Sequence, residues 1–461
     1  MKLGLAYKDI TPNEPAPLLG YGDRTHNSEG VHDPIYVYAW HVDSAVWLIF
    51  DLCLFSAATT TMLTEKIAKR LEKSGVVSTD QIIIQTTHTH SAPDVSLLAG
   101  NEEPWAKRYT DLLVEQAATA AEEAYTTRFE GYIEAALGEN RIAVNRRDKN
   151  RAIDPRVVLF RLKDESGGLE GMLFHYSCHL TSQGVENYLI SADWVGSVRS
   201  HFQAELKVPA AFIQGAEGNT DPYTRGELDM ADPDQAKGVS FDTMEKISRS
   251  MIESLEKAME REPAAVLKTL TLSKHSIALP LRFGAMTEED IREKIDSWKS
   301  QFAEFMHCSP NDIPEDQSIN ALVKEYARKN NISKEETEKQ VASQFTYTQF
   351  LYLYKYGLIP IDKTNGTITV EYTLADFTDL TILGVPAEVL LENAFDFQGR
   401  FPERIALVSS LVGGDFGYMP HETNFQEQRA DILYETISTL FTNQGSILLL
   451  SDAESVLKAQ T

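Results

Sequence analysis

The chain of 461 residues is poor in cysteine and contains no long apolar run. Its three cysteines, Cys53, Cys178 and Cys308, lie far apart without a CxxC pair, which excludes a disulfide framework and a cysteine-based zinc module. No stretch of about 18 apolar residues is present, so we expect no membrane span. The N-terminal segment MKLGLAYKDITPNEP lacks the apolar core of a secretory signal, and we expect a cytoplasmic protein.

Basic residues are scarce beside acidic ones. The chain has 43 Lys and Arg against 68 Asp and Glu, a formal net charge of -25. A surface of this sign repels phosphate backbones, so we expect no nucleic-acid partner. No GxGxxG segment follows a strand and no P-loop is present, which argues against a nucleotide-dependent enzyme.

The chain does contain an alternation of strand-like and helix-like segments over roughly residues 1–265. Short apolar runs predict buried strands, and apolar residues at a spacing of three and four predict helices. We therefore predict an α/β (α+β) fold, with a large mixed sheet flanked by helices. The predicted strands are 46–50, 81–84, 157–162, 171–175 and 209–213, and the predicted helices are 62–71, 104–125 and 241–255.

The composition changes at residues 286–357, which are highly charged and have a helical pattern of apolar residues. Thr287-Glu288-Glu289-Asp290 is typical of a capping box. We interpret 286–357 as a helical insertion or lid; the alternative is a solvated helical hairpin with no part in the chemistry. The flanking parts, 1–285 and 358–461, are predicted to form one catalytic domain. In the second of these we expect strands at 367–372, 380–383 and 404–408, a helix around 431–441 and a strand at 447–450.

Polar side chains with metal-binding or acid–base capacity follow several of the predicted strands. Ligands of α/β sheets bind beyond the carboxyl ends of the strands, so we expect these side chains to converge on one site. They are His88, His90, His175, His179, Asn219, Asp221, Glu388, Asp415 and Tyr418.

The histidines and Glu388 are the candidates for metal ligation. His88 and His90 point to the same side of an extended segment, so they can bind one metal, or one can bind while the other moves protons. His175 and His179 have HxxxH spacing, although a zinc protease would carry Glu in place of a tyrosine here. Glu388 lies among apolar residues, where a carboxylate needs a partner or a cation. The alternatives are histidines satisfied by hydrogen bonds and a Glu388 salt bridge.

The segment 87–93 reads Thr-His-Thr-His-Ser-Ala-Pro. It is similar to the Thr-His-Thr-His-Ser-Gly-Pro segment of the neutral/alkaline (non-lysosomal) ceramidase family, and the chain resembles the N-terminal catalytic domain of that family. Further similar segments lie at 19–22, 30–33, 145–146, 178–182, 191–196, 218–222 and 385–388.

The resemblance implies a zinc amidase-like site. It implies that His88, His179 and Glu388 bind zinc and that His90 lies beside the metal, in contact with the substrate or transition state. It also implies that Arg146 and Tyr418 line the substrate head group. Independently of the family, two histidines and a glutamate suit a catalytic zinc that keeps an open position.

The sequence departs from the family pattern in several places. The family's active-site serine corresponds to Asp221, or to Thr220 if the register shifts by one. Ala430 stands where the family has a tyrosine zinc ligand, with Asp431 and Tyr434 nearby, so another divalent metal is an alternative to zinc. We find neither the family's C-terminal domain nor its signal, and expect a short bacterial-type relative that acts on a smaller, more polar amide than ceramide.

The leading hypothesis is metal-dependent hydrolysis of a linear amide C–N bond by a metal-activated water. His90 would transfer a proton, and Asp221 would orient the water or act as base. Arg146 and Tyr418 would hold the substrate or stabilise the oxyanion. The alternatives are a catalytically degenerate member that binds a ligand, and a metal-dependent esterase or phosphoesterase with Asp221 as nucleophile. The expected partner is a small-molecule amide or ester, and the sequence does not determine the oligomeric state.

Overall fold

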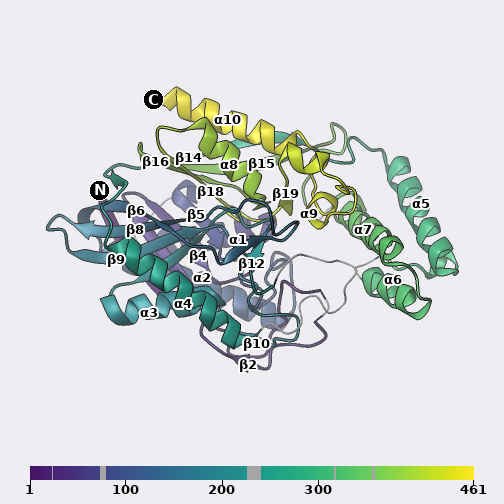
Figure 1. Ribbon diagram of the computed structural model, residues 1–461, viewed down its shortest axis with the longest axis horizontal. Helices are drawn as coiled ribbons and strands as arrows, with labels where there is room; N and C mark the ends of the chain where they lie inside the picture. The colour runs from purple at the N-terminus through teal and green to yellow at the C-terminus, as the bar shows by residue number, and fades with distance from the viewer. Residues whose placement is uncertain (23, 73–78, 226–239, 316–317, 356–358, 461) are drawn as a thin grey trace. The chain divides into compact units, whose positions relative to one another are not determined.

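The computed structural model describes all residues except 23, 73–78, 226–239, 316–317, 356–358 and 461 (Figure 1). The chain divides into two compact units. The first unit comprises residues 1–227, 236–275 and 371–415, and the second comprises 228–235, 276–370 and 416–461.

The first unit is built on a nine-stranded mixed sheet with the order β11-β9-β8-β6-β1-β3-β4-β5, in which β13 also joins β6. The pairs β4–β5 and β9–β11 are parallel, and the other pairs of this order are antiparallel. The predicted strands 157–162 and 171–175 are confirmed as the antiparallel pair β8 and β9. The strands are β1 (Lys2–Asp9), β3 (Tyr36–Val42), β4 (Ala45–Phe50), β5 (Ile82–Thr86), β6 (Phe129–Glu139), β8 (Arg156–Asp164), β9 (Leu169–Tyr176), β11 (Ala210–Gln214) and β13 (Ala265–Leu267).

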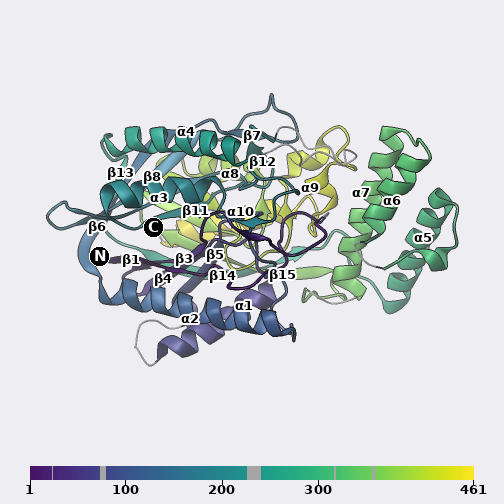
Figure 2. The same ribbon diagram turned by 90° about the horizontal axis from the view of Figure 1, so that it is seen from below.

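Two pairs of helices pack on the same face of this curled sheet, and in Figure 2 α1 and α2 lie on one side of the strands and α3 and α4 on the other. Alternate residues of a strand point to opposite faces, so each strand gives one apolar row to the helices. Rows from β3 and β4 pack on α1 and α2, and rows from β8 and β9 pack on α3 and α4. The helices are α1 (Ala57–Leu71), α2 (Pro104–Thr126), α3 (Trp194–Leu206) and α4 (Phe241–Met259).

The opposite face packs on a second, smaller sheet. Trp40, Phe160 and Ile213 of the large sheet share one core with Ile382 and Leu407 of the small one. In the small sheet β16 is antiparallel to β15 and parallel to β18, and α8 packs on β18. The strands of the small sheet are β14 (Thr271–Pro280), β15 (Thr367–Asp376), β16 (Leu380–Gly384) and β18 (Ile405–Ser409), and the helix is α8 (Leu391–Arg400). The short strands of the first unit are β2 (Gly30–Val31), β7 (Ala143–Asn145), β10 (Leu189–Ile190), β12 (Thr220–Pro222) and β17 (Glu388–Val389).

The large sheet curls until its two edge strands meet. The Gln85 amide of β5 donates to the carbonyl oxygen of Gln214 in β11 at 3.1 Å, and to that of Ser410 just after β18 at 3.0 Å. One side chain therefore joins the carboxyl ends of three parallel pairs, β4–β5, β9–β11 and β16–β18.

The second unit is mainly helical. The predicted capping box is confirmed, since Thr287 accepts from the backbone N–H of Asp290 and the Asp290 carboxylate accepts in return. The use of residues 286–357 as a lid, and their separation from 1–285 and 358–461, stay predictions. The elements are α5 (Glu288–Met306), η3 (Pro310–Asp312), α6 (Ser318–Lys329), α7 (Lys334–Phe350), η4 (Leu351–Lys355), β19 (Tyr418–Met419), η5 (Glu422–Gln426), α9 (Tyr434–Ile437) and α10 (Gly445–Gln460).

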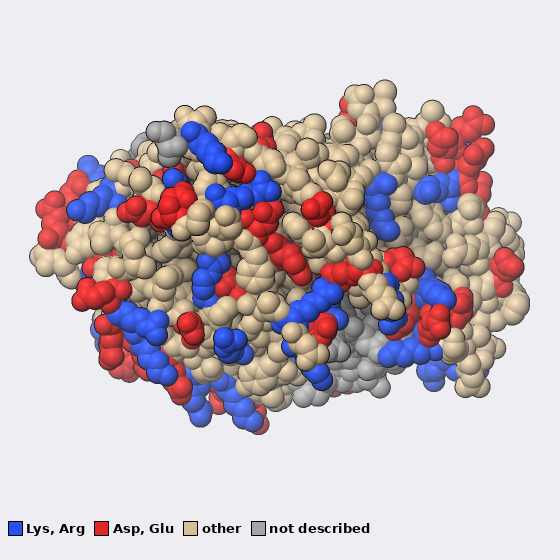
Figure 3. Space-filling view, turned by 45° about the horizontal axis from the view of Figure 1, so that its top comes forward, with Lys and Arg blue, Asp and Glu red and all other residues tan. Residues whose placement is uncertain are grey.

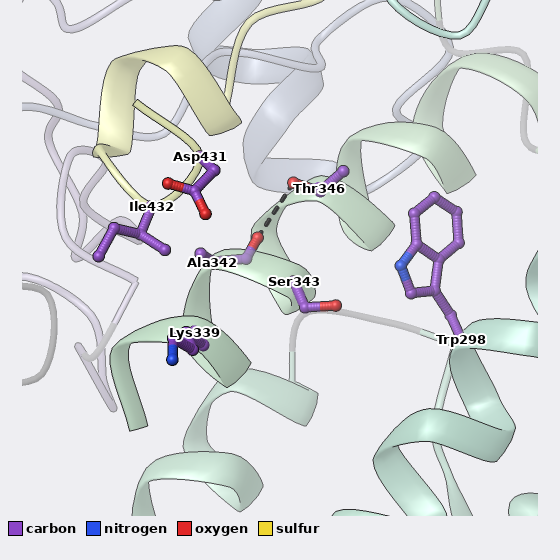
Figure 4. A pocket seen from close by; sticks show the side chains of 7 residues that line it. All are labelled: Trp298, Lys339, Ala342, Ser343, Thr346, Asp431 and Ile432. Atoms are coloured by element: carbon purple, nitrogen blue, oxygen red, sulfur yellow. Dashed lines mark hydrogen bonds between the residues drawn. The ribbon is translucent and has the colours of Figure 1, made fainter. Parts of the chain in front are cut away.

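A hollow of about 230 Å³ lies in this unit between α5, α7 and the segment before α9 (Figure 4). The Thr346 hydroxyl at its edge donates to the carbonyl of Ala342 at 3.0 Å. His88, His90, Arg146, His179, Asp221, Glu388 and Tyr418 do not line it; the lining residues are Trp298, Lys339, Ala342, Ser343, Thr346, Asp431 and Ile432.

Two predictions for the C-terminal region are wrong in kind or extent. Residues 447–450 lie in α10 rather than in a strand, and only 434–437 of the expected helix 431–441 form one. A run of four apolar residues does not distinguish a strand from a buried helix. The buried residues Leu449, Ala453 and Leu457 recur at the helical interval of four.

On the face drawn in Figure 3, acidic and basic side chains are interspersed. Among the described residues, none of the helices combines the length and apolar character needed to cross a bilayer.

His175 of β9 is a buried histidine that should make the free energy of unfolding depend on pH. Its Nε2–H donates to the Val408 carbonyl at 3.0 Å, and burial lowers the pKa of His175 to about 4. The unfolded chain takes up a proton near pH 6.5 and the folded chain does not, so this stability is present above pH 6.5 and is lost as the pH falls toward 4. We expect the free energy of unfolding to fall by about 3 kcal/mol from this group between pH 7.5 and pH 4.

The variant His175→Gln keeps an amide donor but cannot titrate. Denaturant unfolding at several pH values should give a shallower pH dependence for this variant than for the wild type. Equal slopes in the two proteins would contradict the assignment.

Candidate metal centre

His88 lies in a segment that leaves β5 and is fixed by backbone contacts. Its own N–H donates to the Leu52 carbonyl at 2.9 Å, and its φ of 69° is in the left-handed region. The next residue, Thr89, forms a parallel bridge with Leu180, beside His179. The segment after β5 is therefore tied directly to the segment after β9.

His179 follows β9 and is fixed on both sides. Its N–H donates to the Thr220 carbonyl at 2.9 Å, and its own carbonyl accepts from the Trp194 indole at 3.2 Å. Trp194 begins α3, whose N-cap Asp193 also accepts from the Ser182 hydroxyl at 2.6 Å. The motif at 191–196 thus holds the segment that carries His179.

Glu388 begins β17, just beyond β16. The N–H of Gly218 donates to the Val389 carbonyl at 2.9 Å, which brings the segment after β11 against Glu388. A Cβ on Gly218 would lie 2.8 Å from the Glu388 carbonyl oxygen, so this close approach requires glycine.

The three predicted metal ligands meet at one carboxylate oxygen. Glu388 Oε2 lies 3.3 Å from His88 Nε2 and 3.2 Å from His179 Nε2. His88 is 2% exposed, His179 0% and Glu388 6%. Candidate ligand atoms of all three residues lie within 4.8 Å of one another, and neither imidazole gives Glu388 Oε2 a well-aligned hydrogen bond.

The other ring nitrogens show where the protons are. His88 Nδ1 lies 3.0 Å from the Cys53 carbonyl, and His179 Nδ1 lies 2.9 Å from the Glu217 carbonyl. A carbonyl only accepts, so each Nδ1 carries a hydrogen, and in a neutral ring the lone pair is then on Nε2. Two lone pairs and a carboxylate oxygen therefore lie close together, and a proton or a cation between them would offset their repulsion. Arg146 Nη1, at 3.4 Å from His179 Nε2, offsets part of it. A divalent cation fits this donor set.

The pKa shifts of His88 and Glu388 both favour positive charge at this site. Burial opposes a charge on His88, but Cys53 and Glu388 raise the pKa of His88 well above its ordinary value. Burial also favours a neutral Glu388, but His88 and His179 hold the pKa of Glu388 well below its usual range. A shared proton thus satisfies His88 in the absence of metal. The pKa of His179 is instead lowered by burial and Arg146.

His90 lies beside this group, with its Nε2 3.4 Å from His88 Nε2. Its ring meets the Tyr21 ring edge-on at 5.0 Å between centroids. Burial, together with His88 and His179, holds the pKa of His90 well below its ordinary value, so this imidazole is neutral at pH 7. Gly20 makes room for it, because a Cβ there would lie 2.4 Å from the His90 ring.

Arg146 and Asp221 approach His179 from different sides. Arg146 Nη1 lies 3.4 Å from His179 Nε2, and its Nη2 donates to the Gly218 carbonyl at 2.7 Å. Asp221 Oδ1 lies 3.6 Å from His179 Nδ1, on the side away from Glu388, and accepts from the Thr181 hydroxyl at 3.2 Å. Burial opposes ionisation of Asp221, but Arg225 and Arg146 lower its pKa.

Two neighbours of the site were not predicted from the sequence. Glu217 is fully buried, and burial raises its pKa to about 8, a shift that His88 reduces and Glu388 increases. Cys53 follows β4, and its Sγ lies 3.7 Å from His88 Nδ1. Both residues follow parallel strands, so the strand-end rule that identified His88 would have found them too.

The structure brings together His88, His90, His179, Glu388, Arg146 and Asp221, all in the first unit. Tyr418 belongs to the second unit, as do Ala430, Asp431 and Tyr434. There the Tyr418 and Tyr434 rings meet edge-on at 5.3 Å. The predicted role of Tyr418 stays a prediction. His175 donates to Val408 and takes no part in the metal-ligand group.

Among known proteins, this chain is similar to neutral ceramidases. The family model for the N-terminal part of neutral/alkaline non-lysosomal ceramidase matches residues 1–238. Neutral ceramidase of Pseudomonas aeruginosa is 26% identical over 255 residues, which are 48% of this chain and 37% of that protein. Neutral ceramidase A of Dictyostelium discoideum is 23% identical over 259 residues, or 49% of this chain and 36% of that protein. The matches thus span little more than a third of these curated relatives.

Solved structures match over the whole chain. The crystal structure of neutral ceramidase from Pseudomonas aeruginosa has a TM-score of 0.67 at 18% identity and covers 100% of this chain and 74% of its own. A ceramidase complexed with C2 gives a TM-score of 0.66 at 17% identity, over 100% and 75%. At this identity the likeness shows the fold, and the predicted α/β class is confirmed.

Gly20 gives a direct test of the packing around His90. Gly20→Ala places a Cβ at a φ of 105° and against the imidazole, so we expect a loss of about 1–3 kcal/mol in the free energy of unfolding. Gly22→Ala is the matched control, because no atom lies within 4 Å of its Cβ position and its φ is not in the left-handed region. Equal melting temperatures for the two variants would show that Gly20 is not constrained by His90.

Proposed function

The chain belongs to the neutral/alkaline non-lysosomal ceramidase family, and from this we propose that it is a metal-dependent hydrolase of a linear amide bond. We propose His88, His179 and Glu388 as the metal ligands and zinc as the metal. The observation that carries the proposal is the meeting of two buried imidazole nitrogens at Glu388 Oε2, at 3.3 and 3.2 Å.

The ligand set suits catalysis rather than a purely structural site. Structural zinc is held by four protein ligands, whereas catalytic zinc has three and keeps a position for water or substrate. A zinc ion bound there would polarise the amide carbonyl and lower the pKa of a water molecule. The hydrogen bonds from each Nδ1 to a backbone carbonyl fix the rings with Nε2 toward Glu388.

We assign the proton-transfer role to His90. It is neutral, lies 3.4 Å from His88 Nε2, and is partly exposed where the proposed ligands are buried. A neutral imidazole at that place can accept a proton and return it to the leaving amine.

Arg146 and Asp221 act on either side of His179 in this proposal. The guanidinium of Arg146 lies 3.4 Å from His179 Nε2, where it can donate to a carbonyl oxygen that becomes negative. Asp221 is fully buried and lies toward His179 Nδ1, so we assign it to positioning His179 rather than to nucleophilic attack. We retain the proposal that the substrate is a smaller and more polar amide than ceramide.

The ligand assignment predicts zinc affinity. We expect His88→Ala, His179→Ala and Glu388→Gln each to weaken zinc binding by at least about 100-fold, because ligand loss should exceed the effect of losing an outer hydrogen-bond partner. The measurement is metal analysis of protein purified without chelator, followed by zinc titration of the stripped protein. His175→Gln is the control, since it removes a buried histidine that is outside the ligand group. Native-like variants with wild-type zinc affinity would overturn the assignment.

The hydrolase assignment predicts turnover that follows the metal. Chelation should abolish release of amine from short N-acyl amides, and added Zn²⁺ should restore it. His90→Gln should keep zinc while kcat falls by about 10²–10⁴-fold, the usual contribution of general acid–base catalysis. Zinc binding without turnover of any amide would instead identify a protein that binds a ligand without cleaving it.

A further inference from the structure

Three arginines gather around the proposed site of this acidic protein. Arg24 and Arg225 both lie over the Tyr21 ring, at 4.9 and 5.0 Å from its centroid, and that ring contacts His90. Arg146 lies at His179, as described above. These three guanidinium groups lie among the carboxylates of the site, of which Glu388 faces the imidazoles and Asp221 faces two of the arginines.

Asp221 is the carboxylate that two of these arginines approach. Arg146 Nη1 lies 3.8 Å from Asp221 Oδ1, and Arg225 Nε lies 3.5 Å from Oδ2. The contact with Arg225 is not a hydrogen bond, since Arg225 Nε and Asp221 Oδ2 are both buried without a partner among the described residues. Asp221 therefore compensates part of the charge and leaves donor capacity on Arg225.

Arg225 is held in place with this capacity unused. Its Nη1 donates to the Tyr21 hydroxyl, which itself donates to the Gln183 carbonyl at 2.6 Å. The Arg225 side chain is only 10% exposed. A buried guanidinium donor without an acceptor is costly, and a ligand that brings oxygen atoms would remove that cost.

Tyr21, Arg24 and Arg225 are more exposed to solvent than the proposed metal ligands. The proposed ligands His88, His179 and Glu388 are buried, whereas His90, Tyr21, Arg24 and Arg225 are partly exposed. Tyr21 and its two arginines thus belong to the solvent-accessible part of the site, as does His90.

We propose that Arg225 binds a carboxylate carried by the substrate, so that the amides cleaved here are N-acyl amino acids. A planar guanidinium suits a carboxylate, to which it can donate two parallel hydrogen bonds. Arg225 lies over the Tyr21 ring that contacts His90, which requires the anionic group to be close to the scissile amide. The α-carboxylate of an amino acid meets this requirement, because one carbon atom separates it from the amide nitrogen.

This inference rests on the proposed function and specifies its substrate. Water would add across the amide C–N bond, its OH to the acyl carbon and its hydrogen to the nitrogen. The products are a carboxylic acid and a free amino acid.

The test compares three amides with the same acyl chain on the zinc-loaded protein: N-hexanoylglycine, the neutral N-hexanoylglycinamide and N-hexanoylsphingosine. We expect kcat/KM for the glycine compound to exceed that for glycinamide by at least about tenfold, the effect of a hydrogen bond to a charged group. Arg225→Gln should reduce this ratio by about 10–100-fold, mainly through KM, and Arg225→Lys should restore part of it.

Arg161→Gln is the matched control. It removes a buried guanidinium that faces Glu134 at 3.0 Å on the large sheet, and it should leave the ratio of the two rates unchanged. Equal or faster cleavage of glycinamide or the sphingosine amide by the wild type would overturn the inference while leaving the amide hydrolase intact. Failure to cleave any of the three amides with zinc bound would overturn the proposed function itself.

Discussion

The proposed metal site depends on three buried ligand atoms that repel one another: two imidazole nitrogens and one carboxylate oxygen. His88 and His179 each direct an Nε2 lone pair at Glu388 Oε2, because backbone carbonyls accept the hydrogens on both Nδ1 atoms. A shared proton relieves only one of these contacts. A fold stabilised solely by burial and hydrogen bonding would not favour this arrangement, since isolated polar groups are costly in the interior. A divalent cation bound between these donors would make the arrangement favourable, which is why the proposed chemistry rests on it.

The curled sheet makes this meeting possible. The donors come from segments after β5, β9 and β16, which are far apart along the chain. Gln85 holds the corresponding strand ends together, and Gly218 permits the backbone to approach Glu388 closely. Parallel pairs contribute their carboxyl ends to one place, so several unrelated side chains can share a site without a long loop. The surrounding core of two packed sheets then keeps the ligands in fixed positions.

The arginines near the proposed metal ligands set this part of the acidic molecule apart. The chain carries an excess of acidic residues, and the face in Figure 3 mixes both signs. Around the buried donors, by contrast, Arg24, Arg146 and Arg225 bring positive charge to within reach of a substrate. A cation and nearby guanidinium groups both favour an anionic substrate, and in a partly dehydrated site their effect is stronger than in water.

The sequence alone determined strands such as β4, β5, β8, β9 and β11 and the helices α1, α2 and α4, because side-chain period follows local backbone geometry. It did not identify β1, β3, β6, α3 or α8. It also determined the family and the chemical types of His88, His179 and Glu388, whose order along the chain carries the resemblance. It did not distinguish a helix from a strand at residues 447–450, where a short apolar run suits both. Only the tertiary structure decided that Asp221 lies behind His179, that Glu217 and Cys53 border the ligands, and that Arg225 stacks on Tyr21. These relations join residues tens to hundreds of positions apart. They follow from how the sheet curls and packs, which no local pattern records.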